Sequence, residues 1–241
     1  ESDNLAVQGT AFARREKGNH IITSAIEHHA VLHTCQFLEK NGFEVTYLPV
    51  SREGLVNPED VKKNIRPDTV LITVMTANNE TGVIQPVAEI GEIAREHGIP
   101  FHSDAIQALG KIPVNVGRMN VDLATFSAHK VYGPQGVGAL FLKKGVKIRP
   151  LAYGGHHERG LRPGTENTAG ICGFWLAAEL AAAELETESA RQTILRDRLC
   201  GTISETVPRV RLNGAGAPRL PNTLNLSFEF VEGEGILLGL E

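Results

Sequence analysis

The feature that most constrains the fold is the regular alternation of strand-like and helix-like segments over residues 20–142. The run TVLITVM (69–75) has no charged residue and many β-branched ones, which is typical of a parallel strand covered on both faces. Five further runs predict strands: HIITS (20–24), FEVTYL (43–48), IPFHSD (99–104), VDLATFSA (121–128) and GVGALFL (136–142). This βαβα order predicts an α/β fold with a doubly wound, mainly parallel sheet.

The segments between the strands have helix signals. Apolar residues recur at helical spacing over 29–41, and Asn57 followed by Pro58 is a typical helix start. A third helix is predicted from Pro86 to Gly98, which is suited to the position after the last helical residue. Helices alternating with strands in this way are expected to cover both faces of the sheet.

The pattern changes after residue 167. A long segment from there to Gly201 reads as one helix or two, with no breaker after Gly173, and two shorter strands follow. We therefore predict a large domain over 1–183 and the beginning of a smaller α/β domain over 184–241. No internal repeat is evident.

Composition narrows the function classes. The net charge of −4 and the lack of a dominant basic run give no reason to expect a nucleic-acid partner. The longest apolar stretch, 170–185, contains two glutamates, and the sequence opens with no signal-peptide pattern, so no membrane association is expected. Three widely spaced cysteines fit neither a disulfide framework nor a zinc site, which predicts a cytoplasmic protein.

Polar side chains gather where predicted strands end, which is where ligands bind in parallel sheets. Asp104 and Lys130 follow two successive strands. A lysine in a desolvated site can form a Schiff base, and an aspartate can hold a ring nitrogen protonated, as pyridoxal 5'-phosphate (PLP) requires. Gln107 lies about one helical turn after Asp104 and could face the same ligand. The simpler alternative is that Asp104 caps a short helix.

Three more residues at strand ends are candidates for the same ligand. Ser127 and His129 lead into Lys130 and could donate to a phosphate. His28 follows the first predicted strand and could stack on a flat cofactor or exchange protons. The structural alternatives are a strand-end cap for Ser127, a buried histidine for His129 and a helix cap for His28.

Two loops complete the candidates. In NNETG (78–82), Asn79 could bind substrate, although a turn is the ordinary explanation for such a stretch. The loop YGGHHERGLRPGTEN (153–167) is glycine-rich and contains two arginines, which suits anion binding. Its consecutive residues His156, His157 and Glu158 point apart and have no distant ligand pair, so no metal site is expected.

Together these segments resemble a known family. SAIEHHAV, TANNETGVIQPV, HSDAIQALGK, FSAHKVYGPQGVGAL, GGHHERGLRPGTEN and PNTLNLSFEFVEGE occur in the order and spacing of the NifS/IscS-type cysteine desulfurases. These enzymes belong to the class V aminotransferase group of the fold-type I PLP enzymes. The resemblance covers essentially the whole chain and implies a mainly parallel, seven-stranded sheet flanked by helices.

The resemblance also implies roles. Lys130 would bind PLP covalently and move protons, Asp104 would pair with the pyridine nitrogen, and Gln107 would bond the ring hydroxyl. His28 would stack on the ring and take part in catalysis. Ser127 and His129 would bind the phosphate, joined by Thr165 from the partner subunit of a homodimer. Asn79 would help to hold the substrate carboxylate.

The implied activity is conversion of L-cysteine to L-alanine, with sulfur passing to an enzyme persulfide and on to an iron–sulfur scaffold or another sulfur-acceptor protein. We expect the family's phosphate-binding turn before Glu1 and its nucleophilic cysteine after Glu241. Cys35, Cys172 and Cys200 are expected to be small buried apolar residues instead. Two alternatives remain: a selenocysteine lyase or other class V enzyme, and a non-catalytic partner protein with this fold.

Overall fold

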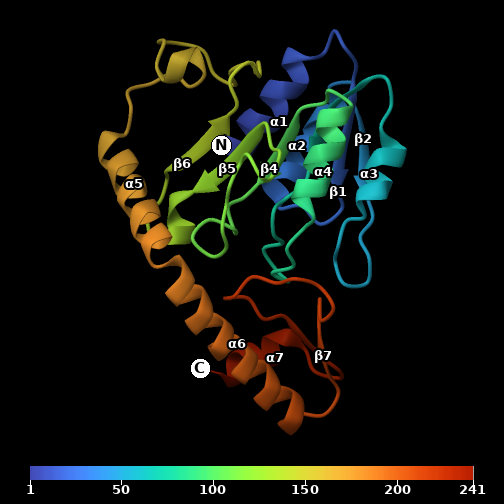
Figure 1. Cartoon of the computed structure of the whole chain (residues 1–241), viewed down its shortest axis with the longest axis vertical. Coiled ribbons are helices and arrows are strands. Elements are labelled where there is room, and N and C mark those ends of the chain that lie inside the picture. The colour runs from blue at the N-terminus through green and yellow to red at the C-terminus, as the bar shows by residue number, and fades with distance from the viewer. Residues whose placement is uncertain (241) are drawn as a thin grey trace.

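The computed structural model describes residues 1–240, and a six-stranded sheet forms its centre (Figure 1). The strand order is β2-β1-β3-β4-β5-β6, in which β1 to β5 are parallel and β6 is antiparallel to β5. The strands are β1 (His20–Ser24), β2 (Glu44–Leu48), β3 (Thr69–Thr73), β4 (Phe101–Asp104), β5 (Leu123–Ser127) and β6 (Gly138–Leu142). The mainly parallel α/β fold is confirmed.

Burial explains why the central strands are apolar throughout. Every residue of β1 and β3 is buried, and alternate side chains enter two different cores. Ile21 and Leu71 pack in one core, whereas their neighbours Ile22 and Ile72 pack in the other. Side chains of a strand alternate between faces, so a strand with a core on each side must be apolar at every position.

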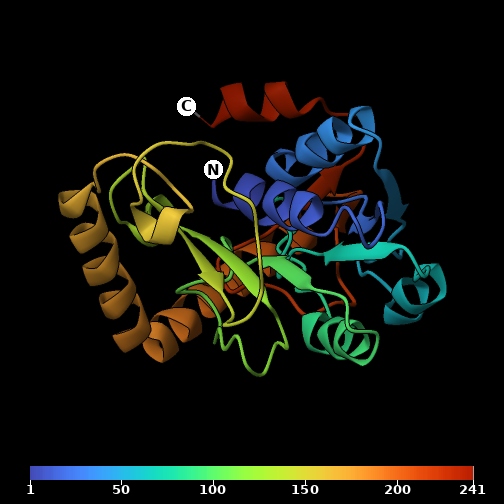
Figure 2. The same ribbon diagram turned by 90° about the horizontal axis from the view of Figure 1, so that it is seen from above.

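Helices cover both faces, as predicted. α1 (Ser2–Ala13) and α2 (His29–Lys40) lie on one face, while α3 (Pro58–Asn64) and α4 (Val87–Glu96) lie on the other (Figure 2). The predicted start of α3 is confirmed, because the Asn57 Oδ1 accepts from the Glu59 N–H at 3.1 Å. Gly98 follows α4 with a φ of +64°, a conformation that glycine adopts without steric cost.

The expected seven strands were wrong for the described residues, whose main sheet has six. The seventh strand came from the family resemblance alone, and the sequence itself has only six strand-like runs before residue 143. The two remaining strands, β7 (Val210–Leu212) and β8 (Leu226–Phe228), pair with each other in a separate antiparallel sheet.

The long C-terminal helix is two helices. α5 (Thr168–Ala183) and α6 (Leu185–Thr206) meet at Glu184 with an angle of 71° between them, although neither Gly nor Pro stands there. A short helix, α7 (Gly233–Gly239), ends the described chain, and α6, β7 and α7 lie beyond the end of α5 (Figure 1). The boundary predicted at 184 coincides with this bend, and the division into two domains stays a prediction.

Within residues 1–240, no single helix is long and apolar enough to cross a membrane. The bent pair α5–α6 meets the length and composition criteria only when its two helices are taken together.

Candidate active site

The topology brings the predicted site residues to one edge of the sheet. β1, β3, β4 and β5 are consecutive parallel neighbours, so their carboxyl ends lie side by side. His28 follows β1, Asn79 follows β3, Asp104 ends β4 and Ser127 ends β5. Lys130 lies in the short 3-10 helix η1 (Ala128–Val131) directly after β5. Four neighbouring strand ends therefore supply the candidates.

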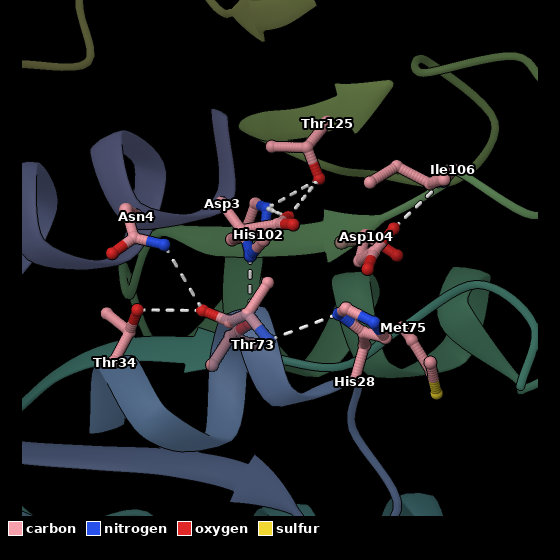
Figure 3. A network of polar contacts seen from close by, with 12 residues as sticks. Asp3, Asn4, His28, Thr34, Thr73, Met75, His102, Asp104, Ile106 and Thr125 are labelled. Carbon is pink, nitrogen blue, oxygen red and sulfur yellow. Dashed lines mark hydrogen bonds and ion pairs between the residues drawn. The ribbon is translucent and has the colours of Figure 1, made fainter. Parts of the chain in front are cut away.

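Asp104 is buried, with 5% of its surface exposed. Its Oδ1 accepts from the Ile106 N–H at 2.9 Å, which fixes the carboxyl within the turn that follows β4 (Figure 3). Burial, followed by the negative charge of Asp3, raises the pKa of Asp104 to about 7. A carboxylate that binds its proton this readily is suited to sharing one with a ring nitrogen.

Lys130 is exposed at the neighbouring strand end and forms no ion pair with any residue of the described chain. Ser127 and His129 stand beside it, and the Ser127 Oγ lies 2.7 Å from the His129 Nδ1. This hydrogen bond pairs the two groups predicted to bind phosphate. His129 is exposed rather than buried, so the alternative of a buried histidine is wrong.

His28 caps a helix, as its simpler alternative proposed. Its Nδ1 accepts from the Ala30 N–H at 3.1 Å at the start of α2. The cap uses one ring nitrogen and fixes the imidazole at the strand edge, so it does not conflict with a role at the cofactor. The cofactor role of His28 stays a prediction.

The loop after β3 is a turn built by Asn78. The Asn78 Oδ1 accepts from the backbone N–H groups of Glu80 and Thr81 at 3.1 and 2.9 Å. Gly82 closes the turn with a φ of +74°. Asn79 is left at the corner, half-buried. The turn explanation is confirmed for Asn78, and substrate binding by Asn79 stays a prediction.

Gln107 and Thr165 are less closely tied to the site. Gln107 lies half-buried in the turn after Asp104, which does not become a regular helix. Thr165 lies in an exposed loop before α5, and no hydrogen bond joins it to Ser127 or His129 in residues 1–240. Their predicted roles at the ring hydroxyl and at a partner's phosphate stay predictions.

Sequence reasoning missed the buried polar groups behind the site. Glu27 precedes His28, and its Oε1 accepts from the Ser24 hydroxyl at 2.5 Å and from the Met75 N–H at 2.9 Å. Burial raises the pKa of Glu27 to about 8, because no water solvates the charged form. Glu27 thereby connects the loop that carries His28 to the end of β3.

A second missed group connects three elements. His102 lies two residues before Asp104 on β4 and contacts Thr73 of β3 and Thr125 of β5, and Thr125 donates to Asp3 of α1 (Figure 3). A histidine inside an otherwise buried strand is a visible signal in the sequence, and so is a glutamate beside a candidate histidine. Neither signal indicates which partner packs against it.

The three cysteines differ from one another. Cys35 is fully buried in α2, and burial raises the pKa of its thiol to about 12. The expectation of burial was wrong for Cys172, which is exposed, and Cys200 is half-buried. Both lie on the helices α5 and α6, which pack little of their surface against the sheet. All three thiols are free.

A cavity of about 450 Å³ lies at the opposite edge of the sheet. Its lining includes Arg14, Lys17, Lys62 and Arg66. These cations stand at or just after the ends of α1 and α3, and helix C-termini attract positive charge. Their positions at helix ends therefore explain why these cations are there. The candidate catalytic residues lie at the other edge, at the carboxyl ends of the strands.

The residues at the active edge fit PLP. Asp104 has one oxygen fixed by Ile106, which leaves the other to bind a ring nitrogen. An amine stands at the next strand end, with a hydroxyl and an imidazole beside it. No group of three His, Cys, Asp or Glu side chains within residues 1–240 is arranged to hold a metal ion.

Comparison with known proteins extends these observations. The family described as aminotransferase class-V matches residues 1–241, and this family is PLP-dependent. A cysteine desulfurase IscS of Dictyoglomus turgidum is 56% identical over 241 residues, which cover 100% of this chain and 61% of that protein. A second IscS, from Methanosarcina thermophila, is 55% identical over 238 residues, with 99% and 59% covered. The chain thus spans about three fifths of the length of these curated relatives.

Solved structures agree. A NifS-like protein superposes with a TM-score of 0.94 at 40% identity, covering 99% of this chain and 66% of that one. SspA, solved in complex with cysteine, superposes with a TM-score of 0.86 at 41% identity, covering 100% and 67%. The resemblance found in the sequence motifs is confirmed, and the chain belongs to the aminotransferase class-V family.

Proposed function

We propose that the complete protein is a PLP-dependent cysteine desulfurase that converts L-cysteine to L-alanine. The observation that carries the proposal is that Asp104 and Lys130 stand at the ends of adjacent parallel strands, in a chain that is 56% identical over its whole length to an IscS relative. The sulfur of L-cysteine would pass to an enzyme persulfide and then to iron–sulfur cluster or thio-cofactor assembly.

PLP supplies, when bound, an aldehyde that joins an amine and a ring that withdraws electrons from it. The Lys130 amine would hold the cofactor and would afterwards take and return the proton at the substrate α-carbon. Asp104 holds a proton on the ring nitrogen, and its raised pKa strengthens that hold. His28 would stack on the ring and exchange protons.

The other residues orient the reactants. Gln107 donates to the ring hydroxyl, and Ser127 and His129 bind the phosphate through the pair they already form. Asn79 holds the substrate carboxylate from the corner of its turn. Thr165 of the partner subunit completes the phosphate site. Cys35 is excluded as the sulfur nucleophile, since a thiol with a pKa of about 12 has almost no thiolate at neutral pH.

We also propose a homodimer. α5 and α6 expose large apolar side chains, among them Trp175 with 65% and Ile194 with 68% of their surfaces exposed. Several exposed apolar side chains of this size on neighbouring helices are typical of an interaction surface. A cytoplasmic location is supported by three free thiols, which persist in a reducing compartment.

The test uses the full-length protein. We expect alanine and persulfide or sulfide from L-cysteine, and a yellow cofactor absorbance that Lys130→Ala abolishes. Lys144→Ala, an exposed lysine after β6, is the matched control and should keep the absorbance. Persistence of the yellow band in Lys130→Ala would refute the assignment of Lys130.

Two further outcomes identify the alternatives. Turnover of selenocysteine without turnover of cysteine would indicate a selenocysteine lyase. Cofactor binding without turnover of any amino acid would indicate a non-catalytic partner protein.

A further inference from the structure

Buried hydrogen bonds connect Thr73, His102, Thr125 and Asp3 behind Asp104 (Figure 3). Asp3 of α1 is a carboxylate and can only accept, so the Thr125 hydroxyl donates to its Oδ1 at 2.5 Å. The Thr125 Oγ1 is then free to accept from the His102 Nε2–H at 3.3 Å. The other ring nitrogen, Nδ1, accepts from the Thr73 hydroxyl at 2.8 Å. The chain of bonds therefore starts at β3 and ends on the Asp3 charge.

His102 does not cancel that charge. Its Nε2 lies 3.7 Å from the Asp3 Oδ1, a separation that would suit an ion pair if the ring were protonated. Complete burial lowers the pKa of His102 to about 4, so the ring is neutral at physiological pH. A neutral ring that donates from Nε2 and accepts at Nδ1 is consistent with these hydrogen bonds. Asp3 is 4% exposed and lies in the first turn of α1, where the helix N-terminus favours a negative charge that the neutral His102 does not cancel.

This charge lies behind the end of β4. Thr125, which Asp3 holds, is the partner of Asp104 in the register of β4 and β5. His102 and Asp104 are two residues apart on one strand, so their side chains lie on the same face. The charged and titratable groups behind Asp104 include Asp3 from α1, His102 from β4 and Glu27 from the loop after β1, while His28 and Lys130 stand at the neighbouring strand ends.

We propose that Asp3 is a positioning residue of the cofactor site, whose buried charge behind Asp104 keeps a proton on the pair formed by Asp104 and the PLP ring nitrogen. Two negative carboxylates close together in a dry interior repel each other, so a proton shared between one of them and a bound ring nitrogen is held more tightly. The proposal rests on the proposed use of PLP. It assigns to α1 a role at the cofactor site, namely the negative charge of Asp3 behind Asp104.

The first test is a titration of Asp104 in the cofactor-free, full-length protein, followed by carboxyl ¹³C NMR. Asp3→Asn keeps the size and the Oδ1 acceptor for Thr125 but removes the charge. We expect the pKa of Asp104 to fall by about 1 in this variant. Asp60→Asn, which removes a negative charge from α3 on the other side of the sheet, should leave it unchanged.

The second test measures binding of two ligands at pH 8. One is 4-deoxypyridoxine phosphate, which has the pyridine nitrogen but no aldehyde for Lys130. The other is the same phosphate ester with a benzene ring. Asp3→Asn should weaken binding of the pyridine ligand about tenfold, the equivalent of one pKa unit, and leave the benzene ligand unaffected.

A second variant separates charge from shape. Asp3→Ser is shorter than Asp3→Asn and equally neutral, so both should give the same Asp104 titration. An unchanged titration, unequal titrations of the two variants, or equal losses for both ligands would overturn the proposal. Failure of the wild-type protein to bind the pyridine ligand would instead overturn the proposed function, and the inference with it.

Discussion

Glu27 makes a quantitative prediction about the stability of this fold, and Glu27→Gln tests it. The pKa of Glu27 rises from 4.5 to about 8 on folding, mainly because its carboxyl is fully buried. A carboxyl with a raised pKa stabilises the folded state below pH 4.5, and this contribution is lost as the pH rises to about 8. At about 1.4 kcal/mol per pH unit, the loss amounts to about 5 kcal/mol in total.

The glutamine variant has no such pH dependence but has a fixed cost. Its Oε1 can keep the bonds from Ser24 and Met75. Its amide group replaces Oε2, which is buried and has no hydrogen-bond partner in the described chain. Leaving the amide donors unsatisfied there costs about 2 kcal/mol. Glu27→Gln should therefore be less stable than wild type at pH 4.5 and more stable at pH 8, with equality near about pH 6.

The assay is urea unfolding of both full-length proteins at several pH values between 4.5 and 8.5. The quantity of interest is the difference in their free energies of unfolding, in which the titrations that both proteins share largely cancel. Glu96→Gln, at the exposed end of α4, is the control and should show no change of sign. A difference that stays constant with pH would refute the reasoning, because Glu27 would then have the same pKa in both states.

Two further predictions concern packing. Gly91→Ala should lower the melting temperature by several degrees in a thermal scan, because its new Cβ would stand 2.5 Å from the Met119 backbone oxygen; unchanged melting would show that the contact between α4 and the segment before β5 yields easily. Cys35 should resist thiol reagents in the native protein and react only after unfolding, since its thiol is buried with a pKa of about 12; rapid native labelling at Cys35, identified by peptide mass, would contradict that burial.

Much of the candidate site could be predicted from the sequence because its residues follow strands directly. Once the βαβ order is recognised, parallel strands must present their carboxyl ends at one edge. The positions of His28, Asp104 and Lys130 after their strands therefore placed them together before any contact was known. The turn at Asn78 was equally local, since its side chain bonds its own neighbours.

What the sequence by itself determined was the alternation of strands and helices, the caps and the strand-end residues, all of which depend on interactions within a few positions. Only the tertiary structure decided that Asp3 accepts a hydrogen bond from Thr125, 122 positions away, and that Glu27 is buried with a hydrogen bond from the Met75 N–H. It also decided the bend at Glu184, where the sequence has no breaker. Burial and pKa depend on which distant segments exclude water from a group, and that is a property of packing rather than of any local pattern.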